Sequence, residues 1–185
     1  MNEDVVKDLK ARIDKTLDDL KKELGKIRTG RANTAMLDGI LVNYYGTPTP
    51  LTGMASLTVP EPRLIVIKPW EKSVLKDIEK AIKEANIGVT PMNDGEIIRL
   101  PLPALTEDRR KELAKQVKGK GEEHKVAIRS VRRDANERLK TLLKDKKITE
   151  DDHKRTHERV QKETDQGITK VDEVVSKKEK EVMEV

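Results

Sequence analysis

The chain has 185 residues, 39% of them charged and 35% hydrophobic, with a formal net charge of +5 and neither cysteine nor phenylalanine. The missing cysteines exclude disulfide bonds and cysteine-based metal sites, and the sequence has no run of 18 apolar residues that could cross a membrane. The acidic start Met1-Asn-Glu-Asp lacks the apolar core of a secretion signal, so we expect a cytoplasmic protein with a thin core of Leu, Ile, Val and Ala.

The prolines and aromatic residues divide the chain into three parts. All eight prolines and all three aromatic residues lie between Tyr44 and Pro103. Proline interrupts a helix because it removes a hydrogen-bond donor and clashes with the preceding turn. The proline-free, highly charged flanks are therefore predicted to be long helices, and the centre a β-containing insertion. We place the helical domain at 1–29 and 106–185, and the inserted domain at 30–105.

The first flank has one apolar stripe at steps of three and four residues, the spacing of one face of a helix. The stripe consists of Val6, Leu9, Ile13, Leu17, Leu20, Leu24 and Ile27. The predicted helix continues through Gly25, which weakens its last turns, and stops at Thr29-Gly30.

The centre contains short apolar runs typical of strands at 40–45, 55–59, 63–68 and 96–100, and an amphipathic helix at 72–85. Residues 46–50 are predicted to form a turn. We therefore expect a small β/α/β domain. At least two of Tyr44, Tyr45 and Trp70 are expected in its core, because a domain without phenylalanine needs its few large side chains inside.

The second flank contains two further stripes. The first, over 106–147, predicts a helix on the order of 60 Å long, with Thr106 as its cap and glycines at 119 and 121 where it can bend. The second predicts a helix from Thr149, where Thr149 and Asp152 resemble a capping box. The linker between them is short, so the two helices should be antiparallel neighbours. The predicted fold class is α+β, an elongated antiparallel three-helix bundle with an inserted small β/α/β domain.

Two short connections join the predicted domains. The chain leaves the helical domain at Thr29 and Gly30 and returns to it through Pro103, Ala104 and Leu105. Two segments of chain between two compact bodies predict a hinge whose motion is limited by its double connection.

Positive charge is concentrated on the helix predicted at 106–147, which holds 15 basic and 8 acidic residues. Its basic residues follow the spacing of the apolar stripe and lie beside the buried face. The row consists of Lys111, Lys115, Lys118, Lys125, Arg129, Arg132, Lys140 and Lys144. Such a row can follow the phosphates of a nucleic acid, and the absence of aromatic residues from it favours structured RNA over unstacked bases.

Two other interpretations of this row stay open at this point. In one, the basic residues only solvate a long helix and pair with Glu and Asp, and the protein is a coiled-coil scaffold that binds other proteins. In the other, the chain is a general structured-RNA-binding module. The stretch Arg129-Ser-Val-Arg-Arg-Asp-Ala-Asn136 favours RNA binding, because Asp134 is its only acid.

The sequence does not indicate a catalytic or metal site. His153 and His157 lie four residues apart but lack the His-Glu-x-x-His pattern of a zinc site, so we expect a solvated helix start there. His124 falls on the apolar stripe, where a core or edge position is expected. The glycine pattern of a phosphate-binding loop is absent. We predict no metal, no cofactor and no enzymatic activity.

Six segments, taken in order, resemble the ribosome recycling factor family. They are Lys26-Ile-Arg-Thr-Gly-Arg-Ala32, Leu37-Asp-Gly-Ile40, Tyr44-Tyr-Gly-Thr-Pro-Thr-Pro-Leu51, Arg99-Leu-Pro-Leu-Pro103, Leu105-Thr-Glu-Asp-Arg-Arg110 and Val131-Arg-Arg-Asp-Ala-Asn136. Each segment alone is a weak signal, but the six in register cover essentially the whole chain and are highly specific. The fold that the resemblance implies, a three-helix bundle plus a β/α/β domain on a two-strand hinge, agrees with the predicted elements.

The resemblance further implies a translation factor without enzymatic activity. With elongation factor G and its GTP hydrolysis, the family splits post-termination ribosomes into subunits, so that mRNA and tRNA are released. The helical bundle is expected to bind the rRNA of the large ribosomal subunit, and the smaller domain to swing when the GTPase pushes. We expect a monomer that does not associate with membranes.

The matching segments also imply which residues contact rRNA. Arg132 is the best single candidate, with Arg129 and Arg133 beside it, and Arg28 and Arg31 fit a contact near the hinge. Lys118 and Lys125 of the basic row complete the predicted set. One departure lies at the hinge, where the family pattern Pro-Pro-Leu-Thr is replaced by Pro103-Ala-Leu-Thr, so that Ala104 is expected to loosen the return connection.

Overall fold

The computed structural model describes residues 1–184 and divides them into two compact units, which are treated separately. The first, here called the helical bundle, comprises Met1–Leu24 and Ala114–Lys180. The second, here called the small domain, comprises Gly25–Leu113 and the residues from Glu181 onward. The domain boundaries suggested by the sequence, at 29/30 and 105/106, stay a prediction.

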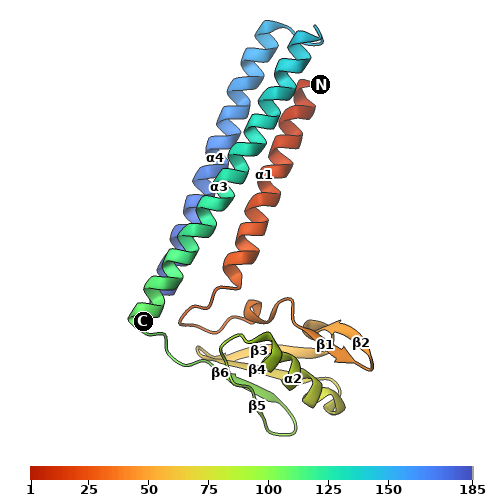
Figure 1. Cartoon of the computed structure of the whole chain (residues 1–185), viewed down its shortest axis with the longest axis vertical. Coiled ribbons are helices and arrows are strands. Elements are labelled where there is room, and N and C mark those ends of the chain that lie inside the picture. The colour runs from red at the N-terminus through yellow and green to blue at the C-terminus, as the bar shows by residue number, and fades with distance from the viewer. Residues whose placement is uncertain (185) are drawn as a thin grey trace. The chain divides into compact units, whose positions relative to one another are not determined.

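The helical bundle is built from three helices that lie side by side (Figure 1): α1 (Asn2–Gly25), α3 (Glu107–Lys144) and α4 (Glu150–Met183). Asp8 and Glu23 of α1 pair with Arg138 and Lys120 of α3, so these two helices are antiparallel. At 1.5 Å per residue, the 38 residues of α3 span about 57 Å. The predicted α+β class with an elongated three-helix bundle is confirmed.

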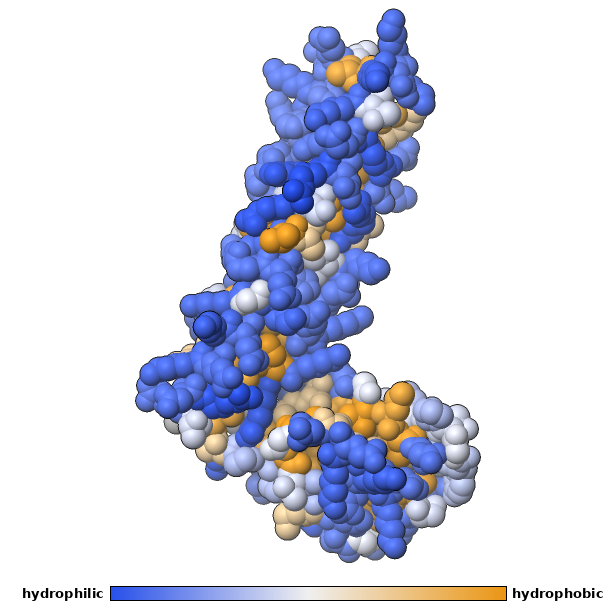
Figure 2. Space-filling model, in the orientation of Figure 1, coloured by the Kyte–Doolittle hydropathy of each residue, from blue (hydrophilic) through white to orange (hydrophobic). Residues whose placement is uncertain are grey.

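The core of the bundle is mainly aliphatic, and its buried polar side chains include two threonines of α4. Thr156 and Thr164 are buried, and their hydroxyls donate to the carbonyls of Asp152 and Val160 at 2.7 Å. A bond to the carbonyl four residues earlier satisfies the hydroxyl inside the core. This arrangement explains why the apolar stripe of α4 is sparse in the sequence. On the outside, hydrophilic residues cover most of the visible face of the bundle (Figure 2).

Two glycines allow the helices of the bundle to approach one another closely. A Cβ atom placed on Gly121 of α3 would lie 2.5 Å from Val175 Cγ2 of α4, and one on Gly167 of α4 would lie 2.8 Å from Ile13 Cγ2 of α1. Real Cβ atoms do not reach such distances, so both positions require glycine. A Cβ atom placed on Gly119, by contrast, would meet no atom within 4 Å beyond its chain neighbours and the backbone of its own helix. α3 continues through both of its glycines as a single helix.

The helix ends follow the capping residues seen in the sequence, with one difference. Thr149 and Asp152 form the predicted capping box, with the Asp152 amide donating to Thr149 Oγ1 at 3.1 Å and the Thr149 amide donating to Asp152 Oδ2 at 3.3 Å. α1, however, ends at Gly25 instead of Thr29-Gly30. Ile27, the last residue of the predicted stripe, therefore lies outside the helix, because glycine favours a helix end and the chain turns there into the linker.

The small domain combines a four-stranded antiparallel sheet, in the order β3-β4-β6-β5, with a separate hairpin β1–β2 and one helix. The elements are β1 (Leu41–Tyr44), β2 (Thr47–Pro50), β3 (Ala55–Glu61), β4 (Leu64–Pro69), α2 (Leu75–Ala85), β5 (Met92–Asn93) and β6 (Ile98–Pro101). Three short 3₁₀ turns lie at Thr34–Leu37, Leu51–Gly53 and Lys72–Val74. Ile67 pairs with Ile98 across the sheet, and both share one apolar cluster with Ile78 and Ile82 of α2.

The structure corrects the prediction at residues 46–50, which form strand β2 instead of a turn. The reversal is Tyr45-Gly46, whose φ angles of 48° and 86° suit the two-residue turn of a hairpin. Within β2, Pro48 faces Asn43 of β1. Proline is tolerated in an edge strand, where its missing N–H group faces no second neighbour. β2 pairs with β1 alone, which is why a proline-rich segment can be a strand here.

The expectation that at least two aromatic residues support the core is wrong. Tyr45 is 74% exposed and Trp70 is 68% exposed, and only Tyr44 packs against the core as a half-buried side chain. The hydroxyls of Tyr44 and Tyr45 donate to the two carboxylate oxygens of Glu71, at 2.6 and 3.3 Å. Isoleucine, leucine, valine and methionine fill the core, so that the large rings are not needed inside.

Asp94 organises the turn between β5 and β6. Its Oδ1 accepts hydrogen bonds from the amides of Glu96 and Ile97, both at 2.9 Å, and its Oδ2 accepts one from Arg99. These bonds favour the charged carboxylate, and they lower the pKa of Asp94 from 3.8 to about 2, with the Ile97 amide as the largest cause. The carboxylate therefore stabilises the folded state above about pH 4, and this contribution is lost as the pH falls from 3.8 to about 2.

Asp94→Asn is expected to make the small domain less stable at pH 5 but no less stable at pH 2. Trp70 is the single tryptophan and lies in this domain, so its fluorescence during urea unfolding at each pH measures the difference. Asp77→Asn, at an exposed position on α2, is the matched control. A loss of stability by the Asp94 variant that stayed constant from pH 5 to pH 2 would contradict the assigned role.

No helix within residues 1–184 combines the length and the apolar character needed to cross a membrane.

Candidate nucleic-acid interface

Some basic side chains of the row on α3 are paired with acidic side chains, and others are not. Lys118 pairs with Glu179 of α4 at 3.9 Å, and Lys125 pairs with Asp172 of α4. The hydrogen bond with Asp172 raises the pKa of Lys125. Both lysines therefore carry their charge next to a carboxylate, which reduces the field that they present to a nucleic acid.

The arginines further along α3 are different. Arg129 and Arg133 are exposed. In the described part of the chain, neither guanidinium forms an ion pair or hydrogen bond. Arg132 is half-buried between them and donates from one terminal nitrogen to Gln161 Oε1 of α4 at 3.3 Å. We refer to Arg129, Arg132 and Arg133 as the arginine surface. Residues three and four apart on a helix share a face, so these side chains form one positive patch that can meet several phosphate oxygens.

Gln161 orients Arg132 without neutralising it. The Gln161 amide nitrogen donates to Asp165 Oδ1 at 2.8 Å, which directs the amide oxygen toward Arg132. An amide accepts a hydrogen bond but carries no charge, so Arg132 keeps its full positive charge while its side chain is held. Gln161 was not recognised from the sequence, because a glutamine on a polar helix carries no signal until the neighbouring helix is placed.

Gln161→Glu is expected to weaken RNA binding while the bundle stays folded. The substitution keeps the shape of the side chain but puts a carboxylate beside Arg132, and the new ion pair competes with phosphate for the guanidinium. We expect a roughly tenfold loss of affinity for structured RNA, equivalent to about 1.4 kcal/mol, with a melting temperature near that of the wild type. Gln166→Glu, on the exposed side of α4, is the matched control. Equal affinities for the two variants would contradict this role.

The acid inside the arginine stretch is bound to another helix. Asp134 Oδ2 accepts a hydrogen bond from Arg12 of α1 at 2.7 Å. Arg12 also lies 3.9 Å from Asp8, and Asp8 accepts a hydrogen bond from Arg138 of α3 at 2.8 Å. Two arginines and two aspartates thus form a chain of alternating charge between α1 and α3.

The first linker comprises residues 26–33, between α1 and the first 3₁₀ turn, and the second linker comprises residues 102–106, between β6 and α3. Arg28 lies in the first linker and joins it to the second. Its guanidinium donates a hydrogen bond to the carbonyl of Pro103 in the second linker. Burial lowers the pKa of Arg28, and Arg109 nearby adds to this effect. Within residues 1–184, Arg28 Nε is buried without an acceptor. The predicted rRNA contact of Arg28 stays a prediction, since the structure shows this side chain joining the two linkers.

Each linker is also attached to the turn between β3 and β4. The amide of Ala32 donates to the carbonyl of Pro62 at 2.6 Å, and the amide of Leu102 donates to the carbonyl of Arg63 at 2.7 Å. Of the predicted hinge residues, Thr29 accepts a hydrogen bond from the Arg31 amide at 3.2 Å, and Leu105 is buried. The linkers are thus bonded to one another and to one turn of the sheet.

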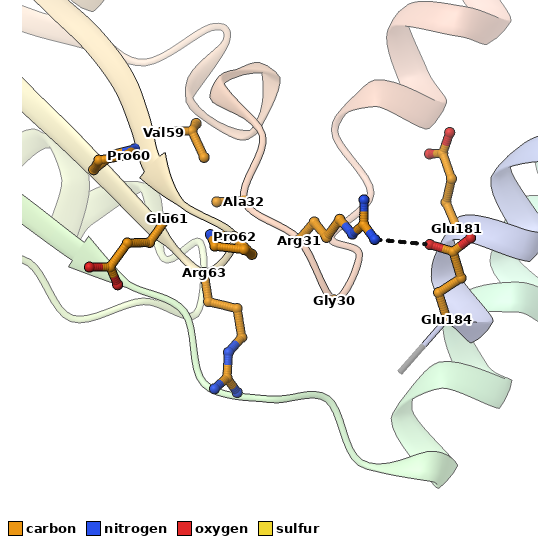
Figure 3. A pocket seen from close by; sticks show the side chains of 10 residues that line it. All are labelled: Gly30, Arg31, Ala32, Val59, Pro60, Glu61, Pro62, Arg63, Glu181 and Glu184. Atoms are coloured by element: carbon orange, nitrogen blue, oxygen red, sulfur yellow. Dashed lines mark ion pairs between the residues drawn. The ribbon is translucent and has the colours of Figure 1, made fainter.

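Arg31 projects from the first linker at the edge of a hollow of about 680 Å³ in the small domain (Figure 3). Its guanidinium lies 3.8 Å from the carboxylate of Glu184, an ion pair in which Arg31 is 79% exposed. The hollow is lined by Gly30–Ala32, the segment 59–63, Glu181 and Glu184. Two arginines and three glutamates belong to this lining, a mixture that favours neither a polyanion nor a polycation.

The three histidines lie in the helical bundle, two of them on α4 and one on α3. His153 and His157 stack with ring centroids 6.1 Å apart, and no group of three or more potential ligand side chains lies near a common point in residues 1–184. His124 is buried in the bundle, with its Nδ1 2.7 Å from the carbonyl oxygen of Lys120.

Comparisons with known proteins agree on one family. The family model described as ribosome recycling factor matches residues 20–183. A ribosome-recycling factor of Myxococcus xanthus (strain DK1622) is 71% identical over the full length of both chains. One from Anaeromyxobacter sp. (strain K) is 56% identical over 99% of this chain and 97% of that protein.

Two solved structures extend this agreement to the fold. A solution structure of the ribosome recycling factor has a TM-score of 0.81 at 39% identity and covers 100% of this chain and 98% of its own. A second match, with a TM-score of 0.69, 40% identity and full coverage of both chains, comes from models for the T. thermophilus ribosome recycling factor and the E. coli elongation factor G bound to the E. coli post-termination complex. The family model matches residues 20–183, and a relative is 71% identical along its whole length. This chain therefore belongs to the ribosome recycling factor family.

Proposed function

We propose that this protein splits post-termination ribosomes into their subunits together with elongation factor G and GTP, and thereby releases mRNA and tRNA. The observation that carries the proposal is the arginine surface of α3, whose three guanidinium groups form no ion pair within residues 1–184, on a member of the ribosome recycling factor family. A solved relative is described in complex with the post-termination ribosome beside elongation factor G. The protein acts by binding and displacement and is not an enzyme.

The arginine surface is the proposed contact with the rRNA of the large subunit. Arg132 is the central residue, because Gln161 holds its guanidinium without removing its charge. Lys118 and Lys125 add weaker contacts, since each shares its charge with an acid of α4. Arg31, which is largely exposed, completes the set near the linkers, together with Arg28.

The two linkers form the proposed hinge, with the helical domain at 1–29 and 106–185 and the inserted domain at 30–105. Thr29 and Gly30 belong to one strand of the hinge, and Pro103, Ala104 and Leu105 to the other. Bonds between the linkers restrict the directions in which the inserted domain can turn when the GTPase acts on it. The protein is proposed to act as a cytoplasmic monomer.

Light scattering of post-termination ribosomes tests the function directly. The ribosomes are mixed with this protein, elongation factor G and GTP, and each component is omitted in turn. Loss of scattering in the complete mixture alone supports the proposal. Unchanged scattering with salt-sensitive binding to RNA would favour a general RNA-binding module instead, and unchanged scattering without RNA binding would favour a protein scaffold.

A cross-link between Arg31 of the inserted domain and Glu184 of the helical domain, with the boundaries proposed here, is expected to stop splitting, while ribosome binding stays at the level of the same double variant without the cross-link. The chain contains no cysteine, so Arg31→Cys and Glu184→Cys introduce the two thiols at positions whose side chains now form an ion pair. A short bis-maleimide then joins the first linker to the residues that follow α4. The same double variant without the reagent controls for loss of the two charges, and full splitting by the cross-linked protein would refute the hinge.

A further inference from the structure

The charge of Asp134 poses a problem for the proposed rRNA contact. Asp134 is the only acid in the stretch from Arg129 to Asn136 and follows Arg133 directly. Its side chain is about half exposed, at 52%. A free carboxylate at this place would repel the phosphates that the arginine surface attracts, because charges within about 10 Å of each other are only partly screened at 0.1 M salt.

The structure places a guanidinium from another helix against this carboxylate. Arg12 of α1 donates to Asp134 Oδ2 at 2.7 Å, and both side chains are partly solvated. Arg12 also forms an ion pair with Asp8, with 3.9 Å between Arg12 Nη1 and Asp8 Oδ2. Asp8 Oδ2 in turn lies 2.8 Å from Arg138 Nη1. Residues 132 and 134 are two positions apart and therefore lie about 200° apart around the helix. Asp134 accordingly contacts Arg12 of α1, whereas Arg132 contacts Gln161 of α4.

We propose that Arg12 is a positioning residue for rRNA binding: it draws Asp134 against α1 and neutralises its charge, so that phosphates approach the arginine surface without a competing carboxylate. Arg12 does not contact the RNA in this arrangement and acts through Asp134. The inference rests on the proposed rRNA contact of Arg132. It adds Arg12, which lies 120 positions before Arg132 in the sequence, to the residues that support rRNA binding.

The Arg12→Ala variant is expected to associate with RNA more slowly than the wild type at low salt, and this difference is expected to disappear at high salt. Charges at the rim of an interface act mainly on the association rate and its salt dependence. Arg12→Ala should reduce the association rate with purified large ribosomal subunits roughly three- to tenfold at 50 mM salt. The difference should shrink toward zero at 0.5 M salt, where the Debye length falls to about 4 Å.

Three further variants separate this role from loss of charge or of structure. Arg138→Ala removes one positive charge and one bond between α1 and α3 but leaves Asp134 paired, so its association rate should stay within about twofold of the wild type. Asp134→Asn in the Arg12→Ala background removes the freed acid and should restore the rate. Arg12→Lys keeps a charge opposite Asp134 and should bind like the wild type even if Arg12→Ala disturbs the fold.

Two results would overturn the proposal: equal rates for Arg12→Ala and Arg138→Ala, or no restoration by Asp134→Asn. Arg132→Ala, measured in the same experiment, distinguishes a failure of this inference from a failure of the proposed function. If Arg132→Ala binds weakly while the Arg12 and Arg138 variants coincide, only the role of Arg12 is refuted. If Arg132→Ala binds like the wild type, the arginine surface itself is not the rRNA contact, and the inference falls with it.

Discussion

Arg132→Ala is expected to weaken binding to the large ribosomal subunit by roughly 10- to 100-fold, which corresponds to the loss of a charge-assisted hydrogen bond of about 1.5–3 kcal/mol. The bundle should stay folded, because the side chain is half-buried and its one described bond is the 3.3 Å contact with Gln161. Binding of labelled protein to purified large subunits over a series of salt concentrations measures the effect.

The salt dependence distinguishes an RNA contact from a structural residue. Each lost phosphate contact should reduce the slope of log affinity against log salt by about one unit. Arg155→Ala, an exposed arginine on α4 outside the arginine surface, is the matched control and should change neither affinity nor slope appreciably. If Arg132→Ala instead lowered the melting temperature and left the slope unchanged, Arg132 would be structural.

Alanine substitutions of three bundle glycines are expected to change stability in opposite directions. Gly119→Ala should stabilise α3 by about 0.5–1 kcal/mol, since alanine is the better helix former and nothing lies within 4 Å of the new methyl group. Gly121→Ala and Gly167→Ala should each be less stable than Gly119→Ala by about 1–3 kcal/mol, the usual cost of overpacking a core. Their new Cβ atoms would meet Val175 at 2.5 Å and Ile13 at 2.8 Å.

The two clashing side chains explain why the bundle cannot absorb the extra methyl groups. Valine and isoleucine in a helix hold one strongly preferred rotamer, so neither can turn away without strain. Urea unfolding followed by far-ultraviolet circular dichroism gives the free energy of unfolding of each variant. Equal stability of Gly119→Ala and Gly121→Ala would show that α3 and α4 do not approach as closely as the structure has them.

Features that depend on neighbours along the chain were predicted well. The apolar stripes of 1–29 and 106–147 recur every three or four residues, and these segments are helical because one face of a helix collects those positions. The Thr149–Asp152 box formed as expected, because both partners lie within one turn. The strands β3, β4 and β6 followed from short apolar runs bounded by turn residues.

The sequence did not predict features that depend on the position of a strand within a sheet or on which side chains already fill the core. Strand β2 carries two prolines, and only its position beside a single neighbour makes them acceptable. Tyr45 and Trp70 lie at the surface because aliphatic side chains from β1, β3, β4, β6 and α2 already fill the small core. Ile27 continued the spacing of α1, but the helix had ended at Gly25.

The candidate interface shows the same division. The sequence by itself determined the family, the helices and the row of positive charge on α3, because composition and spacing are local properties of the chain. Only the tertiary structure decided which of these charges are free: α4 brings acids to Lys118 and Lys125 but a neutral amide to Arg132, and α1 brings Arg12 to Asp134. Coulomb energy depends on distance in space and not along the chain, so the compensated and uncompensated charges of α3 could be told apart only after the three helices were packed together.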